Sequence, residues 1–423
     1  MKADITKNTF NVSKHFSRVI MQQGRVQLDA DWNEQTAILL HYIQTLTKDL
    51  IGEHAGPKDN AAFEISEVND TDLKIGLGNY YVDGILCESE GDVNVDGNRD
   101  SYKYTNQPYY KPSVQLPQDQ GAAYLVYLDV WEYLITHVED ESIREVALLG
   151  ADTATRMQIV WQVKVELGSN NLVLSENDIK INWLEWKKLW QPEHRGLLKA
   201  KAKQADAQSE PCNISPDSRY RAKENQLYRV EIQKGGKLSE NPSFKWSRDN
   251  GSVVSKATLK GNELSLDNTQ GFSSGKFVEL MNDEQELRGE SGLLLKINKI
   301  DEDILYLDGD VVRPTLPTGE NWPTKARLWD SAAILITEES GEDKWLMLEE
   351  GVQIQFQPAN QKNEYRSGDY WLIPARVASG DIEWPTKDGN PMTQEPHGIK
   401  HHYAPLALVK TDHSVVDLRI LMP

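Results

Sequence analysis

The chain has 423 residues, and 65 Asp and Glu against 46 Lys and Arg give it a formal net charge of −19. This balance argues against partners that attract clustered Lys and Arg, namely nucleic-acid backbones and anionic membrane surfaces. The length predicts two or three domains, and the two cysteines, Cys87 and Cys212, exclude a disulfide framework and favour a reducing compartment.

Residues 1–56 are predicted to form an extended arm followed by a long amphipathic helix. Asp31 is the expected N-cap, Glu34 completes a capping-box pattern, and Gly52 is expected to end the helix. Apolar residues at helical spacing make one broad face: Trp32, Leu39, Leu40, Tyr42, Ile43, Leu46 and Leu50. This face needs a partner, which is either the following domain or another copy of the chain.

Residues 57–195 are predicted to form a first β-rich domain. Asp83-Gly84 is a typical hairpin turn, and residues 97–121 are expected to be a surface loop. A tryptophan-rich bridge at 168–195 places three indoles on one helical face, those of Trp183, Trp186 and Trp190. We interpret it as a helix packed on a sheet, in preference to a ligand-stacking platform.

Residues 196–325 are predicted to form a second β domain, and residues 326–423 a C-terminal β-rich region. In 198–203 leucine or alanine alternates with lysine, which indicates a half-buried strand, and 204–218 reads as a polar linker. Between 263 and 307 short strands recur every eight to twelve residues, which favours a small closed barrel. The expected fold is therefore mainly β, with two or three sandwich or small-barrel domains behind the N-terminal helix.

Oxygen-bearing side chains at alternate positions of one loop resemble a calcium-binding loop: Asp92, Asn94, Asp96, Asn98 and Asp100. The bidentate Glu of that template is replaced by Lys103, and flanking helices are not predicted. A solvated hairpin tip explains the same residues. We therefore treat them as weak metal candidates and predict no bound metal or cofactor.

Four histidines lie close together in the sequence near the C-terminus: His397, His401, His402 and His413. The i, i+4 spacing of the first two suits a helical zinc pair, but the neighbouring Pro396, Gly398 and Pro405 oppose a helix. Asp29-Ala30-Asp31 is better explained by helix capping than by sugar-nucleotide binding. No complete catalytic motif is found, so no catalytic residue is predicted.

Several stretches together resemble one family. They are Ser17-Arg-Val-Ile-Met-Gln-Gln-Gly-Arg-Val-Gln-Leu-Asp-Ala-Asp-Trp-Asn-Glu34, Asp152-Thr-Ala-Thr-Arg156, Val160-Trp-Gln-Val-Lys-Val165, Glu224-Asn-Gln-Leu-Tyr-Arg-Val-Glu231, Phe244-Lys-Trp-Ser-Arg-Asp-Asn250, Gly368-Asp-Tyr-Trp-Leu-Ile-Pro-Ala-Arg376, His402-Tyr-Ala-Pro-Leu-Ala407 and Val416-Asp-Leu-Arg419. They resemble the uncharacterised structural proteins, of baseplate or tail-fibre type, that are associated with phage-tail-like contractile injection systems. The resemblance spans nearly the whole chain and implies a particle component, without supplying a mechanism.

The sequence therefore predicts a structural, non-enzymatic subunit that forms a homo-oligomer, with a trimer as the expected state, and docks to other subunits of such a particle. The expected assembly interface consists of Phe16, Arg18, Met21, Arg25, Trp32, Leu39, Ile43 and Leu46. Synthesis in the cytoplasm, no insertion into a membrane and later release with the particle are also expected. A monomer whose helix packs on its own domain, a glycan-binding or glycan-cleaving receptor protein and a Ca²⁺-stabilised adhesion module are the alternatives.

Overall fold

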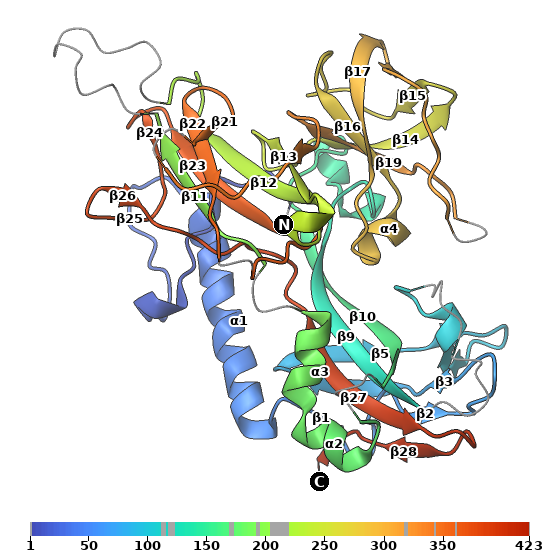
Figure 1. The fold of residues 1–423 in the computed structure, drawn as a ribbon. Helices are drawn as coiled ribbons and strands as arrows, with labels where there is room; N and C mark the ends of the chain where they lie inside the picture. The colour runs from blue at the N-terminus through green and yellow to red at the C-terminus, as the bar shows by residue number, and fades with distance from the viewer. Residues whose placement is uncertain are drawn as a thin grey trace, which may run out of the picture. The chain divides into compact units, whose positions relative to one another are not determined.

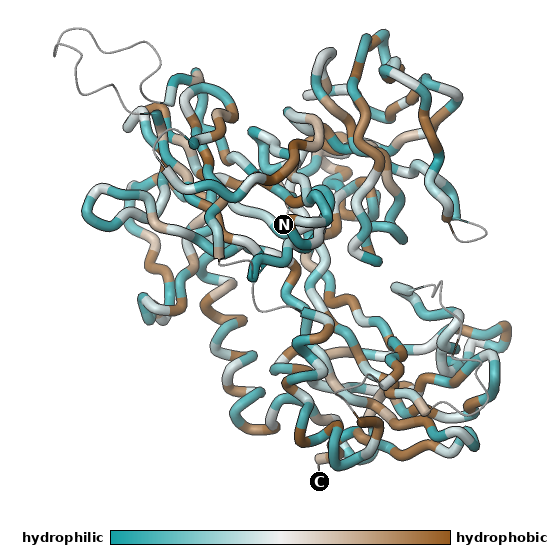
Figure 2. The backbone as a smooth tube through the Cα atoms, viewed as in Figure 1, coloured by the Kyte–Doolittle hydropathy of each residue, from teal (hydrophilic) through white to brown (hydrophobic). Residues whose placement is uncertain are grey.

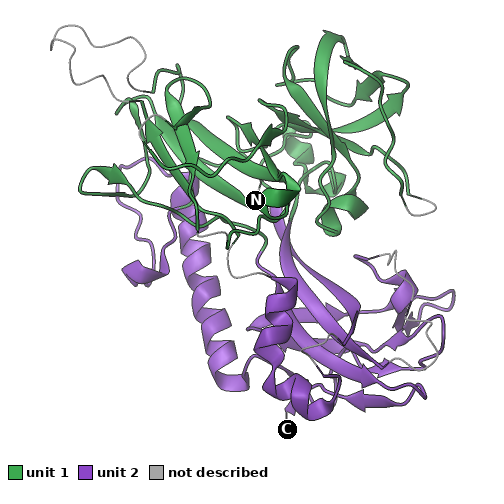
Figure 3. Ribbon diagram, in the orientation of Figure 1, with its two compact units in different colours: residues 1–8, 134–155, 193–399 green, residues 9–133, 156–192, 400–423 purple. Residues whose placement is uncertain are grey.

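The computed structural model describes residues 2–110, 116, 123–168, 173–191, 195–203, 220–316, 320–341, 344–359 and 362–422. Over these residues the chain is mainly β, as predicted, and its helices are α1 (Asp29–Ile51), α2 (Glu176–Ile181), α3 (Trp183–Trp190) and α4 (Asp283–Leu287) (Figure 1). It forms two compact units (Figure 3). Unit 1 comprises residues 1–8, 134–155 and 193–399, and unit 2 comprises 9–133, 156–192 and 400–423.

Unit 2 contains two four-stranded sheets, with strand orders β29-β1-β4-β5 and β10-β9-β27-β28, and a small sheet β2-β3-β8. The strands, with the separate hairpin β6-β7, are β1 (His54–Pro57), β2 (Ile65–Ser66), β3 (Lys74–Ile75), β4 (Gly78–Val82), β5 (Ile85–Ser89), β6 (Asp92–Val93), β7 (Arg99–Asp100), β8 (Tyr102–Lys103), β9 (Tyr124–Ile135), β10 (Arg156–Leu167), β27 (His402–Val409), β28 (Val415–Asp417) and β29 (Leu421–Met422). The sheets combine strands from both ends of the chain, since β27 pairs with β9 and β29 pairs with β1.

The two faces of β9 contribute to different cores because successive side chains of a strand point to opposite sides. Val126, Leu128 and Val130 join the main core of unit 2, with residues such as Phe63 and Trp161. Leu125 and Tyr127 lie on the other face, against α2 and α3, and pack there with the buried side chains of Trp183 and Trp186. The prediction that the tryptophan-rich bridge is a helix packed on a sheet is confirmed.

Unit 1 contains a five-stranded sheet, β20-β13-β12-β23-β24, a three-stranded sheet, β11-β22-β21, and a closed barrel, β14-β15-β18-β17-β16-β19. Its strands, with the separate hairpin β25-β26, are β11 (Leu198–Ala202), β12 (Gln226–Lys234), β13 (Ser243–Ser247), β14 (Val254–Lys260), β15 (Glu263–Leu266), β16 (Phe277–Met281), β17 (Leu293–Asp301), β18 (Ile304–Leu307), β19 (Lys325–Trp329), β20 (Ile334–Leu335), β21 (Leu346–Met347), β22 (Val352–Phe356), β23 (Tyr370–Arg376), β24 (Asp381–Ile382), β25 (Thr386–Lys387) and β26 (Asn390–Pro391).

The closed barrel predicted from the regular strand spacing is confirmed, and four of its strands coincide with the predicted ones. The remaining two, β14 and β19, close it by pairing with each other and with β15 and β16. The predicted boundary at 325/326 falls inside β19. More generally, the predicted domains follow one another along the chain, whereas the compact units interleave, because pairing such as β11 with β22 joins residues far apart in sequence.

Several local predictions can be compared directly with the structure. The alternating lysine segment is a strand, β11, with its leucine and alanines buried, as predicted. The predicted surface loop 97–121 is wrong in part, because β7 and β8 lie in it and Tyr104 is 1% exposed in the core. The predicted linker 204–218 lies outside the described residues. Whether the sheets beyond the barrel form sandwiches stays a prediction.

The N-terminal boundary of α1 differs from the prediction. The helix begins at Asp29 with Leu28 as N-cap and without a side-chain cap, so the predicted Asp31 cap and Glu34 capping box are wrong. Asp29 and Asp31 instead lie in the first turn, where the helix dipole favours negative charge. Gly52 is the C-cap, as predicted, and its amide donates to the Lys48 carbonyl.

The predicted Asp83-Gly84 turn joins β4 to β5 and packs closely on α1. Both residues have positive φ, 48° and 84°, as the tight hairpin turn requires. A Cβ added to Gly84 would lie 2.1 Å from the carbonyl oxygen of Gln44 in α1. The hairpin can therefore approach the helix only through a glycine.

We expect Gly84→Ala to destabilise the protein by about 1–3 kcal/mol more than Gly97→Ala does. Gly97 is a matched control, because its φ is +79° and no atom lies within 4 Å of an added Cβ. Urea denaturation of the two variants measures the difference. Equal losses of stability would contradict the close approach of the hairpin to α1.

Candidate functional site

Exposed apolar side chains follow one face of α1 and continue into the segment before it. All eight residues of the predicted interface are exposed: Phe16 (53%), Arg18, Met21 (50%), Arg25, Trp32 (78%), Leu39 (51%), Ile43 (58%) and Leu46 (60%). Along α1 the hydropathy alternates between apolar and polar stretches (Figure 2). A partner could therefore reach these side chains, and the interface itself stays a prediction.

Residues 9–28 run up to α1 and touch it at its first turns and its middle. The Thr9 hydroxyl donates to the Glu34 carboxylate at 2.6 Å, and the Val19 amide donates to the Gln35 side chain at 2.8 Å. The Phe10 ring lies 5.8 Å from that of His41. Further along the segment several apolar side chains are exposed: Val12, Phe16, Ile20, Met21, Val26 and Leu28.

A different face of α1 is attached to unit 2. Ala30 and Ile38 are buried, and Lys48 forms an ion pair of 2.6 Å with Asp83 of the β4–β5 turn. Asp83 also lies 2.9 Å from Nδ1 of His402. Burial would raise the pKa of the Asp83 carboxyl, but the hydrogen bonds from His402 and Lys48 lower it below its usual range. The ionised carboxylate of Asp83 thus attaches α1 through Lys48. The apolar face of the helix remains exposed.

The proposed calcium-loop residues form the tip of the β6–β7 hairpin. The Asn94 side-chain oxygen accepts from the amides of Asp96 and Asn98, and its side-chain nitrogen donates to Asp100. Asp92 accepts from the side chain of Asn106. These contacts are those of a hairpin tip. No group of three or more His, Cys, Asp or Glu residues suited to a metal occurs within the described part of the chain.

Each of the four C-terminal histidines has its own partner. His401 Nδ1 lies 2.7 Å from Asp129, His402 pairs with Asp83, and His413 lies 3.3 Å from Asp70. The His397 ring packs 5.6 Å from that of Tyr370. His397 and His401 are not in a helix, as the neighbouring Pro396, Gly398 and Pro405 predicted.

The sequence analysis missed a buried charged cluster in unit 1, which consists of Lys2, Glu139, Arg229, Glu231, Lys245, Glu279, Glu286 and Lys325. Lys245 Nζ lies 2.6 Å from Glu279 and 3.5 Å from Glu231. Lys325 is paired with Glu139 at 2.9 Å and with Glu286. Lys2 extends to Glu231 at 3.3 Å and Glu286 at 3.6 Å. The cluster joins the five-stranded sheet to the barrel.

Every carboxylate of the charged cluster is held ionised. Burial would raise the pKa of Glu231, but Lys2, Arg229 and Lys245 lower it below its usual value. Burial is likewise outweighed at Glu279, chiefly by Lys245. Glu279 also accepts from the Trp329 indole at 2.8 Å and the Gly292 amide at 2.9 Å. Such an arrangement stabilises a structure and leaves these groups unsuited to proton transfer at neutral pH.

A second group of carboxylates in unit 1, which sequence reasoning also missed, contains Asp249, Asp330 and Glu349. Asp330 accepts from Lys276 at 2.6 Å and from the Arg248 amide at 2.8 Å, and Arg248 also pairs with Glu349. Burial and the nearby Asp330 raise the pKa of Asp249 to about 6. The Arg-Asp-Asn triplet at 248–250 gave no signal, because the strand partners that surround it come from distant parts of the chain.

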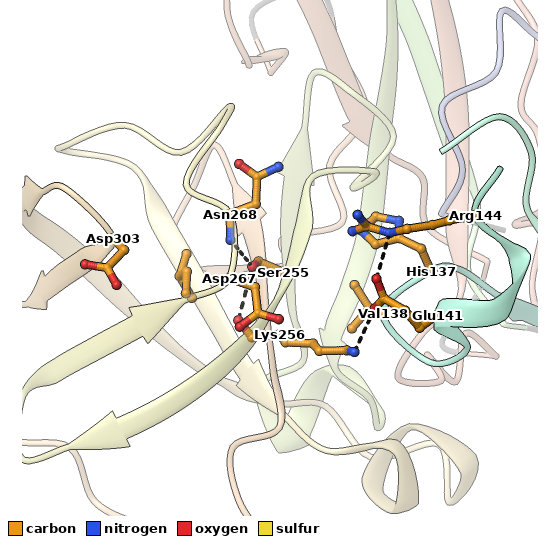
Figure 4. Close-up of a pocket in the computed structure, with 10 residues that line it drawn as sticks. His137, Val138, Glu141, Arg144, Ser255, Lys256, Asp267, Asn268 and Asp303 are labelled. Carbon is orange, nitrogen blue, oxygen red and sulfur yellow. Dashed lines mark hydrogen bonds and ion pairs between the residues drawn. The ribbon is translucent and has the colours of Figure 1, made fainter. Parts of the chain in front are cut away.

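Unit 1 also has a polar cavity of about 590 Å³ (Figure 4). It is lined by the 137–144 segment and by residues of the barrel, including Lys256, Asp267 and Asp303. Glu141 lies 2.9 Å from Lys256 and 3.2 Å from Arg144, so charged groups of the lining pair with one another. Among the described residues that line the cavity there is no Trp, Tyr or Phe, which makes this lining a poor glycan-stacking surface.

A family model matches residues 1–175 and 193–416, and its description is a family of unknown function, DUF6519. The chain belongs to DUF6519. The matched ranges include the whole of α1 and the charged cluster, so both features lie within the DUF6519 region. A search of curated proteins and a search of solved structures found no match. Over its described residues this DUF6519 chain has no helix with the length and hydropathy needed to cross a bilayer.

We expect Lys245→Met to destabilise unit 1 by about 3–5 kcal/mol, because it leaves Glu279 and Glu231 buried without their shared cation. Lys299→Met is the matched control, since Lys299 pairs with Asp301 on the surface and should leave stability almost unchanged. Chemical denaturation measures both. A Lys245→Met variant as stable as the control would show that the pairing contributes nothing.

We expect Asp249→Asn to stabilise the protein by at most about 1 kcal/mol at pH 7–8, a value reduced from the full shift because the Asp249 residue is exposed to solvent. An acid whose pKa is raised by folding favours the folded state below its unfolded pKa and loses that contribution as the pH rises through about 6. The gain should therefore vanish below pH 4. Melting curves against pH test this, with the exposed Asp310→Asn as control; a gain that persists at pH 3 would contradict it.

Proposed function

We propose that this chain is a structural, non-enzymatic subunit of a phage-tail-like contractile injection particle, of baseplate-associated, extension or fibre type. It self-assembles and docks to other particle subunits through the N-terminal arm and the apolar face of the amphipathic helix α1. The observation that carries the proposal is the exposure of that face on a helix whose other side is attached to unit 2. The particle itself is inferred from the motif resemblance alone.

The size of the exposed surface supports an interface. Seven large apolar side chains on α1 are between 43% and 78% exposed: Trp32, Leu39, Leu40, Tyr42, Ile43, Leu46 and Leu50. Grouped apolar exposure of this kind marks an interaction surface more often than single exposed residues do. Covering these side chains is favourable by roughly 25 cal/mol per Å² of apolar area removed from water, before the cost of association. An apolar surface of this extent is expected to be covered in the assembled protein.

The buried charges of unit 1 also support a structural role. The carboxylates of the charged cluster are paired with cations and hold lowered pKa values, which suits a rigid connection between sheet and barrel. Lys2 contributes to this cluster, and the Ala3 carbonyl accepts from the Asn250 side chain at 2.8 Å. The first residues of the chain are therefore held within unit 1.

A glycan-cleaving receptor protein is the second candidate. The observation in its favour is the raised pKa of Asp249, about 6, beside Asp330, which is bound by Lys276 and Arg248. A carboxyl group with a raised pKa near a second carboxyl group is the usual general acid of glycosidases. Hydrolysis of an oligosaccharide panel that is lost in Asp330→Asn would support it.

We expect contractile particles isolated from the encoding strain by gradient centrifugation to contain the chain in a fixed ratio to sheath protein, measured by mass spectrometry. Leu46→Glu should lower its content at least several-fold, because a charge enters the apolar face. Leu184→Glu is the matched control, since Leu184 is equally exposed on α3, at 58% against 60% for Leu46. Point variants are preferable to truncation, which would also remove Lys2 from the charged cluster.

Particles that lack the chain would contradict the proposed function. If particles contain the Leu46→Glu variant at the wild-type level, the apolar face of α1 is not needed for docking. If the Leu184→Glu variant were depleted from the particles as strongly as Leu46→Glu, the cause would be added surface charge in general and not the apolar face of α1.

A further inference from the structure

Six exposed residues of α1, five of them apolar, follow a strict heptad pattern, and the exposed Leu40 and Tyr42 flank it. Starting from Trp32, the intervals are 4, 3, 4, 3 and 4 residues, and every position is exposed: Trp32, Thr36, Leu39, Ile43, Leu46 and Leu50. In coiled-coil terms Thr36, Ile43 and Leu50 are a positions, and Trp32, Leu39 and Leu46 are d positions. An a/d stripe of period 3.5 is the narrow seam of a helix that packs along another helix.

This seam is separate from the face that attaches α1 to unit 2. Ala30 and Ile38, the buried residues of the helix, occupy b and c positions. The Thr36 hydroxyl donates to the Trp32 carbonyl at 3.3 Å, so the one polar side chain of the seam has its hydrogen bond within the helix and can present its methyl group to a partner. The seam is thus complete over about 27 Å of helix.

We propose that the seam is covered by α1 of a second copy of this chain, running antiparallel, in a two-helix coiled coil around a two-fold axis. This deepens the proposed function, on whose assembly surface it rests. In this arrangement Trp32 lies opposite Leu50 of the second copy, Thr36 opposite Leu46 and Leu39 opposite Ile43. Each a residue therefore meets a d residue, which makes the seam complementary to itself, as an isologous interface requires.

The charges around the seam favour a second copy over a different, charged partner. The flanking e positions are Asn33, Leu40 and Thr47, and the g positions are Gln35, Tyr42 and Asp49. Coiled coils that select a different partner commonly use opposite charges at e and g, which are nearly absent here. Two chains of net charge −19 repel each other, so they can meet best along an uncharged strip.

The ends of the helix favour the antiparallel orientation. Asp29 extends the heptad as an a position, so a parallel pair would bring the Asp29 carboxylates of both copies together, with Asp31 and Glu34 at the same end. Like charges at a coiled-coil end oppose that pairing, whereas antiparallel helices also align their dipoles favourably. A two-fold axis relates two copies only, so this antiparallel pairing makes a dimer and not the expected trimer.

The mass of the purified full-length chain tests the second copy. Light scattering should give about 96 kDa, twice 48.0 kDa, for the wild type and for Leu184→Glu. Ile43→Glu should give the monomer mass, with an unchanged circular dichroism spectrum. Ile43 and Leu184 are equally exposed, at 58%, so the two variants differ only in place. A wild-type monomer, a trimer near 144 kDa or an unaffected Ile43→Glu dimer would overturn the proposal.

Cysteine cross-linking tests the orientation. Chains carrying Trp32→Cys and Leu50→Cys, with different tags, are co-expressed and oxidised; the antiparallel pair should give a disulfide-linked product that contains both tags. Trp32→Cys alone should remain unlinked, and the wild type controls for native cysteines. Cross-linking of Trp32→Cys with itself would show a parallel pair and overturn the antiparallel assignment.

The two proposals fail in different ways. If the chain is found in particles but is a monomer when purified, the proposed function stands. In that case a second copy does not cover the seam. If the chain forms a dimer through α1 but is absent from particles, this inference stands and the proposed function is wrong.

Discussion

The contact on which unit 1 depends is the buried pairing of Lys245 with Glu279. Lys245 belongs to the five-stranded sheet and Glu279 to the barrel, and both side chains are 1% exposed. Neither charge could be buried alone, because desolvating an unpaired ion costs several kcal/mol. Two β substructures, each with its own apolar core, are therefore held in register by a contact that tolerates little displacement.

The charged cluster extends this constraint to parts of the chain that are distant in sequence. Glu139 lies in the 134–155 segment and Lys2 near the N-terminus, and both meet the sheet and barrel there. The named cations and carboxylates alternate, so each carboxylate contacts at least one lysine or arginine. A subunit that transmits or resists force within a particle would benefit from such a connection, since displacing one member exposes the charge of another.

In contrast to the buried, paired charges of unit 1, α1 has an apolar face that is exposed. Its attached side uses small and polar contacts, the close approach of Gly84 to Gln44 and the ion pair of Lys48 with Asp83. Its other side carries large apolar residues that are exposed. The same helix thus separates what stabilises the subunit from what we propose joins it to another subunit.

The sequence by itself determined the local elements, because their causes are local. The spacing of apolar residues predicted α1 with the correct C-cap and a start three residues too late. Asp83-Gly84 predicted a hairpin, the alternation at 198–202 a strand, and the regular short strands a barrel. The eight residues predicted to form an assembly interface are all exposed, and the interface itself stays a prediction. Only the tertiary structure decided which strands meet, and hence that β27 joins β9 and that β19 closes the barrel. The charged cluster and the raised pKa of Asp249 could not be predicted, because each depends on side chains from several distant strands, and burial and charge pairing are properties of positions in space.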